Sequence, residues 1–167
     1  MVCTVGTMNV ASRHVYMNTL QSVGRTMNVA IVGSSKATME QAEKQVREYL
    51  AMLSPAETVI GNCDCKGIDA IVNEIARPLG FEIHVEKTYP QKDKDIPFNF
   101  WKEMELTNER LAKWADMATC FALPYGTTKR LRCTYCKQAG LPFDTHEKTA
   151  GCRTVLLNTN HSLEILT

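Results

Sequence analysis

Hydrophobic and polar residues alternate in blocks along the chain, and the lengths of these blocks predict strands and helices in turn. Short continuous apolar runs, which predict buried strands, lie at 27–33, 58–61, 117–123 and 153–157. Residues 81–85 alternate between apolar and polar and predict a further strand near a sheet edge. Apolar residues recur at helical spacing over 39–53, 68–79, 99–115 and 129–139.

Capping residues support two of these helices. Thr38-Met39-Glu40-Gln41 fits a capping box, in which the Thr hydroxyl and the Gln side chain satisfy free N–H groups of the first turn. Gly80 follows the helix at 68–79, at the place of a C-cap glycine. These helices therefore have defined starts and stops.

Continuous apolar strands that alternate with helices indicate a parallel sheet covered on both faces. We therefore predict an α/β fold: a Rossmann-like, doubly wound, parallel five-stranded sheet in the order 3-2-1-4-5. Ligands bind such sheets beyond the C-terminal ends of the strands. Three loops are expected to meet there, at 33–38, 61–69 and 124–128. Residues 1–26 show no clean period and are predicted to be an N-terminal extension of one domain at 27–167.

Composition limits the range of functions. The 167 residues carry a formal net charge of +1, and 44% are hydrophobic. Proteins that coat nucleic acid or anionic membranes are usually more basic, although Lys129-Arg130-Leu131-Arg132 is a local basic patch. No apolar run approaches the ~20 residues of a membrane span. We expect a cytoplasmic protein with no membrane partner, which forms a homo-oligomer.

The three loops mix glycine with small polar residues, and each precedes a helix. A helix N-terminus offers unpaired N–H groups, and glycine lets the backbone approach an anion closely. Gly33-Ser34-Ser35 is the strongest candidate for a phosphate cradle. The alternative is that it only makes a tight strand-to-helix turn. It is neither a dinucleotide fingerprint nor a Walker loop.

Read together, the loops resemble the SLOG superfamily, which is named after the DNA-processing protein Smf (DprA) and the plant LOG enzymes. Val29-Ala30-Ile31-Val32-Gly33-Ser34 looks like its opening strand and turn, and Lys66-Gly67-Ile68-Asp69 is similar to its Gly-Val-Asp element. Asn108 and Arg110 match its Arg-Asn element, and Gly126-Thr127 matches the Gly-Thr before its fourth helix. The resemblance covers about residues 27–143.

The resemblance implies that the crevice binds a nucleotide, a nucleotide-derived signal or single-stranded DNA. The ligand-binding residues it implies are Gly33, Ser34, Ser35, Lys66, Gly67, Asp69, Asn108, Arg110, Gly126 and Thr127. Two features depart from the family. Its Gly-Gly pair in the second loop is replaced by Asn62-Cys63 or Cys63-Asp64, and the glutamate of the LOG signature is missing after Gly126-Thr127.

Individual side chains allow more than one role. Asp69 is a candidate to bind a ribose hydroxyl or act as a base, or else complements the helix dipole. Arg110 is a candidate for bidentate phosphate binding, or else a surface ion-pair residue. Glu105 and Glu109 are further candidate catalytic acids. One of the aromatic residues is a candidate for stacking on a base, although packing is their commoner role: Phe98, Phe100, Trp101 and Tyr125.

The seven cysteines do not form a disulfide framework for a domain of this size. Cys133, Cys136, His146 and Cys152 are a candidate Cys3His set, so a structural zinc ion is predicted to pin the loop at 133–152. The alternative is unligated thiols. Cys63-Asp64-Cys65 is a poorer metal motif, and Cys120 is expected in the core.

Three functional hypotheses follow. The leading one is a protein that binds a nucleotide or nucleotide-derived small molecule. The second is a hydrolase that cleaves the N-glycosidic bond of a nucleoside 5′-monophosphate with Asp69, Glu105 or Glu109. The third is a single-stranded nucleic-acid binding protein that uses Lys129, Arg130 and Arg132 with the loop aromatics.

Overall fold

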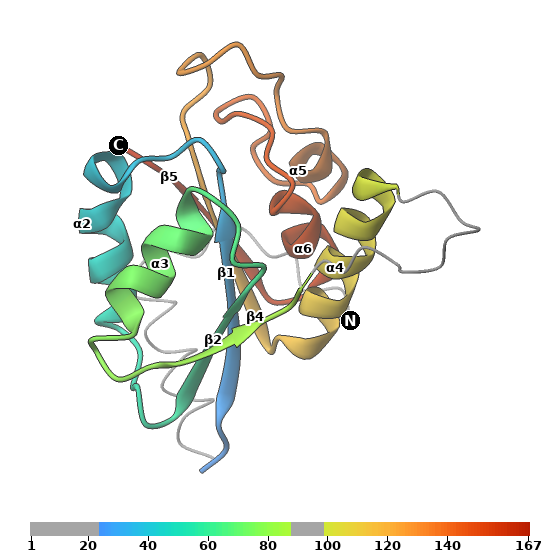
Figure 1. Ribbon diagram of the computed structural model, residues 1–167. Helices are drawn as coiled ribbons and strands as arrows, with labels where there is room; N and C mark the ends of the chain where they lie inside the picture. Colours follow the sequence, from blue (N-terminus) through green and yellow to red (C-terminus); the bar gives the residue numbers. More distant parts are fainter. Residues whose placement is uncertain (1–23, 88–98) are drawn as a thin grey trace.

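The computed structural model of the chain describes residues 24–87 and 99–167, and within them five strands form one sheet (Figure 1). The sheet order is β3-β2-β1-β4-β5, and every neighbouring pair is parallel. The strands are β1 (Met27–Gly33), β2 (Thr58–Asn62), β3 (Glu82–Val85), β4 (Met117–Ala122) and β5 (His161–Ile165). The predicted α/β class and strand order are confirmed.

Helices cover both faces of this sheet, as Figure 1 shows. The helices α2 (Met39–Leu50) and α3 (Ile68–Ala76) pack together on one face. On the other face, α4 (Phe100–Trp114) packs against α6 (Cys152–Leu157), and α6 packs against α5 (Thr134–Gln138). Within the described ranges, no helix is both long and apolar enough to cross a bilayer.

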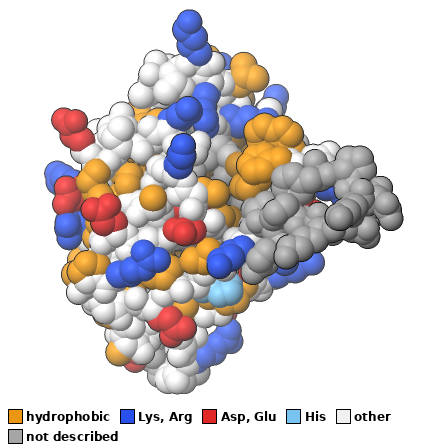
Figure 2. Space-filling view, in the orientation of Figure 1, with side chains coloured by type: hydrophobic (Ala, Val, Ile, Leu, Met, Phe, Trp, Pro, Cys, Tyr) orange, Lys and Arg blue, Asp and Glu red, His pale blue; other side chains and the backbone are white. Residues whose placement is uncertain are grey.

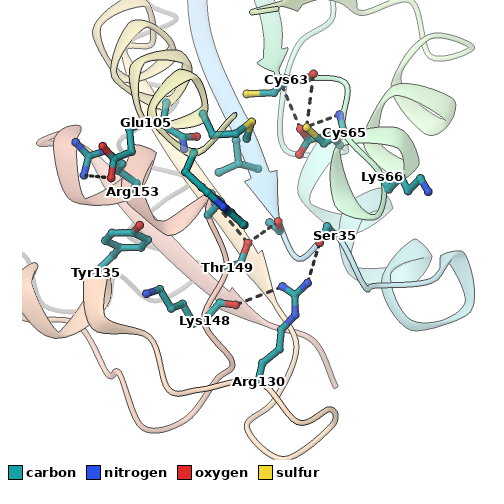
Figure 3. A pocket seen from close by; sticks show the side chains of 18 of the residues that line it. Ser35, Cys63, Cys65, Lys66, Glu105, Arg130, Tyr135, Lys148, Thr149 and Arg153 are labelled. Atoms are coloured by element: carbon teal, nitrogen blue, oxygen red, sulfur yellow. Dashed lines mark hydrogen bonds and ion pairs between the residues drawn. The ribbon is translucent and has the colours of Figure 1, made fainter. Parts of the chain in front are cut away.

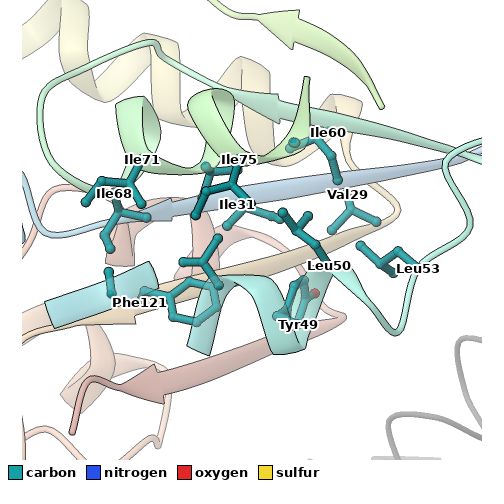
Figure 4. Close-up of a cluster of buried hydrophobic side chains, with 14 of the residues drawn as sticks. Val29, Ile31, Tyr49, Leu50, Leu53, Ile60, Ile68, Ile71, Ile75 and Phe121 are labelled. Atoms are coloured by element: carbon teal, nitrogen blue, oxygen red, sulfur yellow. The ribbon is translucent and has the colours of Figure 1, made fainter. Parts of the chain in front are cut away.

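The two faces of the sheet have different cores. Side chains alternate across a strand, so Val29 and Ile31 of β1 point to the α2–α3 face. There they meet large apolar side chains, among them Leu50, Ile60 and Phe121, and Figure 4 shows how closely these pack. This face therefore carries most of the apolar burial that stabilises the fold.

The opposite face is lined by small residues. Ala30 of β1 and Ala118 and Cys120 of β4 are fully buried there, and the side chains packed on them include Cys133, Cys136 and Cys152. Small residues and thiols bury less apolar area than the leucines and isoleucines of the other face. This face therefore depends more on other interactions to hold α5 and α6.

Local capping follows the sequence signals. Thr38 caps α2, and its reciprocal bonds with Gln41 form the predicted capping box. By contrast, the helix predicted at 68–79 is the shorter α3, which ends at Ala76 with Arg77 as its C-cap. Gly80 is therefore not the C-cap, and its positive φ of 88° closes the turn that follows the helix. The helix predicted at 99–115 is observed as α4, with Asn99 as its N-cap.

Two elements were predicted wrongly. The apolar run Val155-Leu156-Leu157 belongs to helix α6 and not to the fifth strand, which lies further on at His161–Ile165. The helix predicted at 129–139 is confined to Thr134–Gln138, because Arg132 pairs with Glu147 in an extended bridge. Residues 1–23 of the predicted extension, Phe98 and the rest of 88–98 lie outside the described residues.

Gly67 is the glycine that the fold requires most clearly. Its φ is +75°, and a Cβ there would lie 2.1 Å from the Ser34 carbonyl oxygen. We expect Gly67→Ala to lower the free energy of unfolding by about 3 kcal/mol or more, because backbone strain adds to the clash. Gly140→Ala is the matched control: its φ is +71° but no atom lies within 4 Å of a Cβ there. The control should cost only about 1 kcal/mol in denaturant unfolding, and equal losses would contradict this account.

Candidate functional site

A cavity of about 690 Å³ opens beyond the C-terminal ends of the strands, at the edge where ligands bind such sheets. Its wall is formed by the turn after β1, the loop after β2, the first turns of α4, and the segment from Arg130 to Arg153 (Figure 3). Four separate segments of the chain therefore meet there. The volume is that of a site for a small organic ligand.

One end of the cavity is basic. Arg130 donates from Nη2 to Ser35 Oγ over 3.1 Å and from Nη1 to the Lys148 carbonyl oxygen over 3.5 Å. The Lys148 ammonium lies 5.2 Å from the centre of the Tyr135 ring. In the described part of the chain, neither Arg130 nor Lys148 forms an ion pair with a carboxylate. Their positive charge is therefore available to an anionic ligand.

The glycine turn after β1 lies directly against the start of α3. Ile68 N donates to the Ser34 carbonyl oxygen over 3.1 Å, which holds the loop after β2 on the turn. Ser34 itself is buried, and its Oγ accepts from Lys36 N over 3.2 Å. Ser35 and Gly33 remain on the cavity surface. The exposed Lys66 also contributes to the lining, but its side chain is directed away from Arg130 in Figure 3.

Another part of the cavity wall is the segment at 148–151, which contacts the end of β1. Thr149 Oγ1 donates to the Gly33 carbonyl oxygen over 2.7 Å. Gly151 approaches so closely that a Cβ there would lie 2.9 Å from Gly33 N. The 148–151 segment is therefore fitted to the same turn that was predicted to cradle a phosphate.

Asp69 is a buried carboxyl group on the cavity lining, with 5% of its surface exposed. Its Oδ2 accepts from Cys63 N over 3.1 Å and from Cys65 N over 3.3 Å. Burial raises the pKa of Asp69 to about 7, although these two backbone N–H groups act in the opposite direction. At neutral pH, Asp69 can therefore take up or release a proton.

This raised pKa makes a pH-dependent contribution to stability. The folded pKa lies above the ordinary value of 3.8, so the folded state binds more protons between about pH 4 and pH 7. The contribution of Asp69 to stability therefore falls as the pH rises through that window. When the pH is raised from 5 to 8, we expect the free energy of unfolding of Asp69→Asn to increase by roughly 2 to 3 kcal/mol relative to that of the wild type. Urea unfolding of both proteins at the two pH values measures this gain, and a constant difference would contradict it.

The thiols beside Asp69 are poor nucleophiles. Burial, followed by the charge of Asp69, raises the pKa of Cys63 far above that of a free thiol. The same two causes raise the pKa of Cys65 to about 11. Both residues line the cavity, but at neutral pH they remain protonated thiols.

The α4 side of the cavity is polar. Asn108 is 3% exposed, and its Oδ1 accepts from Thr154 Oγ1 over 3.0 Å. Arg153 of α6 pairs with Glu109 over 2.8 Å and with Glu105 over 4.0 Å. Glu105 lines the cavity, whereas Glu109 is not part of the lining. The two glutamates that were candidate catalytic acids therefore share one arginine.

Aromatic and apolar side chains border the cavity mouth. Trp101 and Phe100 of the first turn of α4 are 74% and 51% exposed, and Leu131 is 76% exposed. Figure 2 shows basic side chains and an apolar patch close together on one face of the molecule. Exposed rings beside cations suit a planar, anionic ligand.

The structure separates several predicted residues from the cavity. Arg110 pairs with Glu86 over 2.7 Å and donates to the Lys87 carbonyl oxygen, so its guanidinium lies beyond the end of β3. Gly126 and Thr127 are exposed in the loop after β4 and are not on the lining. The predicted residues that do line the cavity are Gly33, Ser35, Lys66, Asp69, Phe100, Trp101, Glu105, Asn108 and Arg130.

Cys133, Cys136, His146 and Cys152 form a buried cluster whose ligand atoms all lie within 4.8 Å of one another. Cys133 is the N-cap of α5, Cys136 lies one turn on, and Cys152 begins α6. Hydrogen bonds from the thiols of Cys136 and Cys152 lower the pKa of Cys133, so the cluster favours a thiolate there. The predicted four residues are thus gathered at one point.

This cluster holds the segment that forms the cavity wall. Eight residues of the described lining lie between positions 130 and 153, interleaved with the four cluster residues. Buried Glu147 accepts from the backbone N–H and the hydroxyl of Thr128, which ties the loop before Arg130 to the same segment. The cluster and Glu147 together therefore fix the positions of Arg130 and Lys148.

The sequence did not reveal Tyr135, Lys148, Thr149, Gly151 or Arg153 as lining residues. Each lies within a few positions of a candidate metal ligand, and that proximity was the available signal. Arg130 was recognised only as part of a basic patch.

No protein-family model matches the sequence, and no curated protein matches it. Among solved structures, the chain is similar to DNA processing protein A from Helicobacter pylori, which was described for its single-stranded DNA binding mode. The likeness covers 64% of this chain and 59% of that chain, with 16% sequence identity and a TM-score of 0.45. At this level, the similarity concerns the arrangement of strands and helices alone.

Proposed function

We propose that the protein binds a nucleotide or a nucleotide-derived molecule in this cavity, with the ligand phosphate at Ser35, Arg130 and Lys148. The observation that carries the proposal is that the Arg130 guanidinium lies on Ser35 of the glycine turn after β1, while Lys148 lines the same cavity beside Tyr135. Neither cation has a carboxylate partner among the described residues. Charge-assisted hydrogen bonds from such cations are strong and suit phosphate oxygens.

The rest of the cavity suits a nucleoside. The exposed rings of Phe100 and Trp101 offer faces for a base at the mouth. Base–aromatic stacking contributes about 1 to 3 kcal/mol. An inorganic anion would leave this apolar part of the site unused, so a phosphate joined to a base fits the whole cavity better.

Membership of the SLOG superfamily is part of the same proposal. Its Gly-Ser turn and its Gly-x-Asp element correspond to Gly33-Ser34 and Gly67-Ile68-Asp69, which are in contact at the cavity. The Arg110 and Gly126-Thr127 matches lie outside the lining. The proposal therefore rests on the first two elements.

We also propose that the Cys3His cluster binds a structural zinc ion. Thiolate and imidazole ligands suit zinc, whose bonds to them of about 2.0 to 2.3 Å place ligand atoms about 3.5 Å apart in a tetrahedron. The four ligand atoms lie within 4.8 Å of one another, so small side-chain movements would complete the site. All four residues are buried, as in sites that hold a fold together rather than act on a substrate.

Calorimetric titration with nucleoside mono-, di- and triphosphates and ADP-ribose tests the ligand proposal. We expect at least one of them to bind with a 1:1 stoichiometry. If none of these compounds binds to folded protein that was prepared with zinc, nucleotide binding is contradicted. Release of free base during the titration would support the hydrolase hypothesis, for which Asp69 is the candidate catalytic group inside the cavity.

A single-stranded nucleic acid is the second candidate ligand. The observation that favours it is the open, aromatic mouth of the cavity, near which Arg132 lies 4.6 Å from the centre of the Tyr125 ring. Such a ligand would bind with a steep dependence on salt concentration. Titration of an oligonucleotide at two salt concentrations separates it from a mononucleotide, which contacts fewer cations.

A further inference from the structure

Two side chains on the cavity lining are almost completely buried and yet keep one polar atom without a partner. Asp69 is 5% exposed and Asn108 is 3% exposed. Among the described residues, Asp69 Oδ1 and Asn108 Nδ2 have no hydrogen-bond partner. Neither atom is among the enclosed polar atoms that lack a partner, so both reach the cavity surface.

The second oxygen of Asp69 and the side-chain oxygen of Asn108 are both hydrogen-bonded within the protein, and these bonds determine which atom of each side chain faces the ligand. Asp69 Oδ2 is held by the N–H groups of Cys63 and Cys65, which leaves Oδ1 as an acceptor for the ligand. Asn108 Oδ1 is held by the Thr154 hydroxyl, which leaves the Nδ2 group as a donor. The cavity therefore presents one buried acceptor and one buried donor.

We propose that Asp69 and Asn108 form a subsite for the sugar hydroxyls of the ligand, so that the cavity selects ribonucleotides. This inference rests on the proposed function. A ribose hydroxyl donates its proton to Asp69 Oδ1, and the same hydroxyl or its neighbour accepts from Asn108 Nδ2. Hydroxyls match this pair because each is both a donor and an acceptor.

The positions of the two residues agree with the order of groups in a nucleotide. Asp69 lies two residues after Gly67, which touches Ser34 and Ser35 at the basic end of the cavity. Asn108 lies seven residues after Trp101 on α4, roughly 10 Å along the helix from the exposed rings. Asp69 is thus close to the proposed phosphate position, and Asn108 is about two helical turns from the aromatic mouth of the cavity.

A second phosphate fits this subsite poorly. The Asp69 carboxylate on the lining would repel it. A neutral hydroxyl avoids this repulsion and satisfies both atoms. A ligand without hydroxyls would leave a buried acceptor and a buried donor unpaired, which costs at least about tenfold in affinity.

Titration of the full-length protein at pH 8, above the Asp69 pKa of about 7, tests the subsite. The probes are the four ribonucleoside 5′-triphosphates and monophosphates and their 2′,3′-dideoxy counterparts. We expect the ribonucleotide that binds best to bind at least about tenfold more tightly than its dideoxy form. In Asp69→Asn, the N–H groups of Cys63 and Cys65 hold the amide oxygen, so the amide nitrogen faces the ligand and no acceptor remains for the hydroxyl proton. The preference should therefore shrink through weaker binding of the ribonucleotide, while the dideoxy form binds as well as before or better.

The control variant is Asp64→Asn. Asp64 is an exposed residue of the same loop and is not part of the lining, and its Oδ1 accepts from Asn73 Nδ2 over 2.9 Å. The asparagine keeps an oxygen for this bond, so the variant removes a nearby charge without removing a group of the subsite. This variant should keep the ribose preference. If Asp69→Asn binds both forms more tightly, Asp69 acts only as a nearby charge and the subsite is wrong. Equal binding of ribo and dideoxy forms by the wild type also overturns the subsite, whereas no binding of any probe overturns the proposed function as well.

Discussion

A Cys136→Ser variant is expected to lose the zinc ion proposed for the Cys3His cluster and to unfold at a temperature about 10 °C or more below that of the wild type. Cys136 is fully buried among Cys133, His146 and Cys152, and a hydroxyl is a poor ligand for zinc. Loss of a structural metal removes binding free energy that contributes directly to folding, by roughly 3 kcal/mol or more. Metal analysis by mass spectrometry and a thermal scan of the purified variant measure the two effects.

Cys65→Ser is the matched control. Cys65 is a half-buried thiol on the same cavity but lies outside the cluster. This variant should retain about one metal ion per chain and a nearly unchanged melting temperature. If wild-type protein prepared with zinc contains no metal, or if Cys136→Ser melts like the control, the four residues are packed thiols and an unliganded histidine.

A variant with Arg130→Gln and Lys148→Gln is expected to bind its nucleotide about 100-fold more weakly than the wild type. Each cation contributes a charge-assisted bond to phosphate, worth about 1.5 kcal/mol or more. Both glutamines keep most of the side-chain volume, so the melting temperature should change little. Calorimetric titration with the nucleotide that binds the wild type best measures the loss.

The control for this variant removes the same two charges elsewhere. Arg77 and Lys44 are exposed and lie away from the cavity lining. Arg77→Gln with Lys44→Gln should therefore retain wild-type affinity to within about twofold. Equal losses in the two double variants would mean that net charge, and not the geometry around Ser35, governs binding.

The parts of the fold that the sequence predicted correctly are those with one dominant local signal. The strand at 27–33 is a continuous apolar run that ends in glycine, and α2 has a complete capping box. The sheet order followed from right-handed crossovers between such elements. These features depend on near neighbours in the chain, so a single sequence contains them.

The errors arose where contacts between distant segments decide the structure. Val155-Leu156-Leu157 is too short and apolar for its period to distinguish a strand from a helix. It is helical because Cys152 and Val155 pack on the small residues of the sheet, beside Cys133 and Cys136. The true fifth strand, His161–Ile165, is only half buried along its length, so its apolar signal was weak.

The same contrast between local sequence signals and contacts between distant segments applies to the candidate site. Gly33, Ser35 and Asp69 were found because they follow strands that end at the ligand edge. Arg110 was expected at the phosphate, but Glu86, which lies 24 residues earlier in the chain, binds its guanidinium. Lys148 reaches the cavity only because the segment between His146 and Cys152 folds back on β1.

The composition of the two sheet faces gives a physical reason for the position of the Cys3His cluster. The α4–α6 face of the sheet has Ala30, Ala118 and Cys120 where the other face has larger apolar residues. A metal ion bound by Cys133, Cys136, His146 and Cys152 would supply cross-links that this smaller core lacks. The same cross-links would hold the segment that carries Arg130 and Lys148 in the cavity wall.

The most direct test is a crystal structure of the protein grown with the nucleotide that binds it best. Electron density for the ligand phosphate should lie within hydrogen-bond distance of Ser35 and the Arg130 guanidinium, with the sugar on the side of Asp69 and Asn108. A nucleotide bound on another face of the molecule, with this cavity filled only by water, would contradict the account.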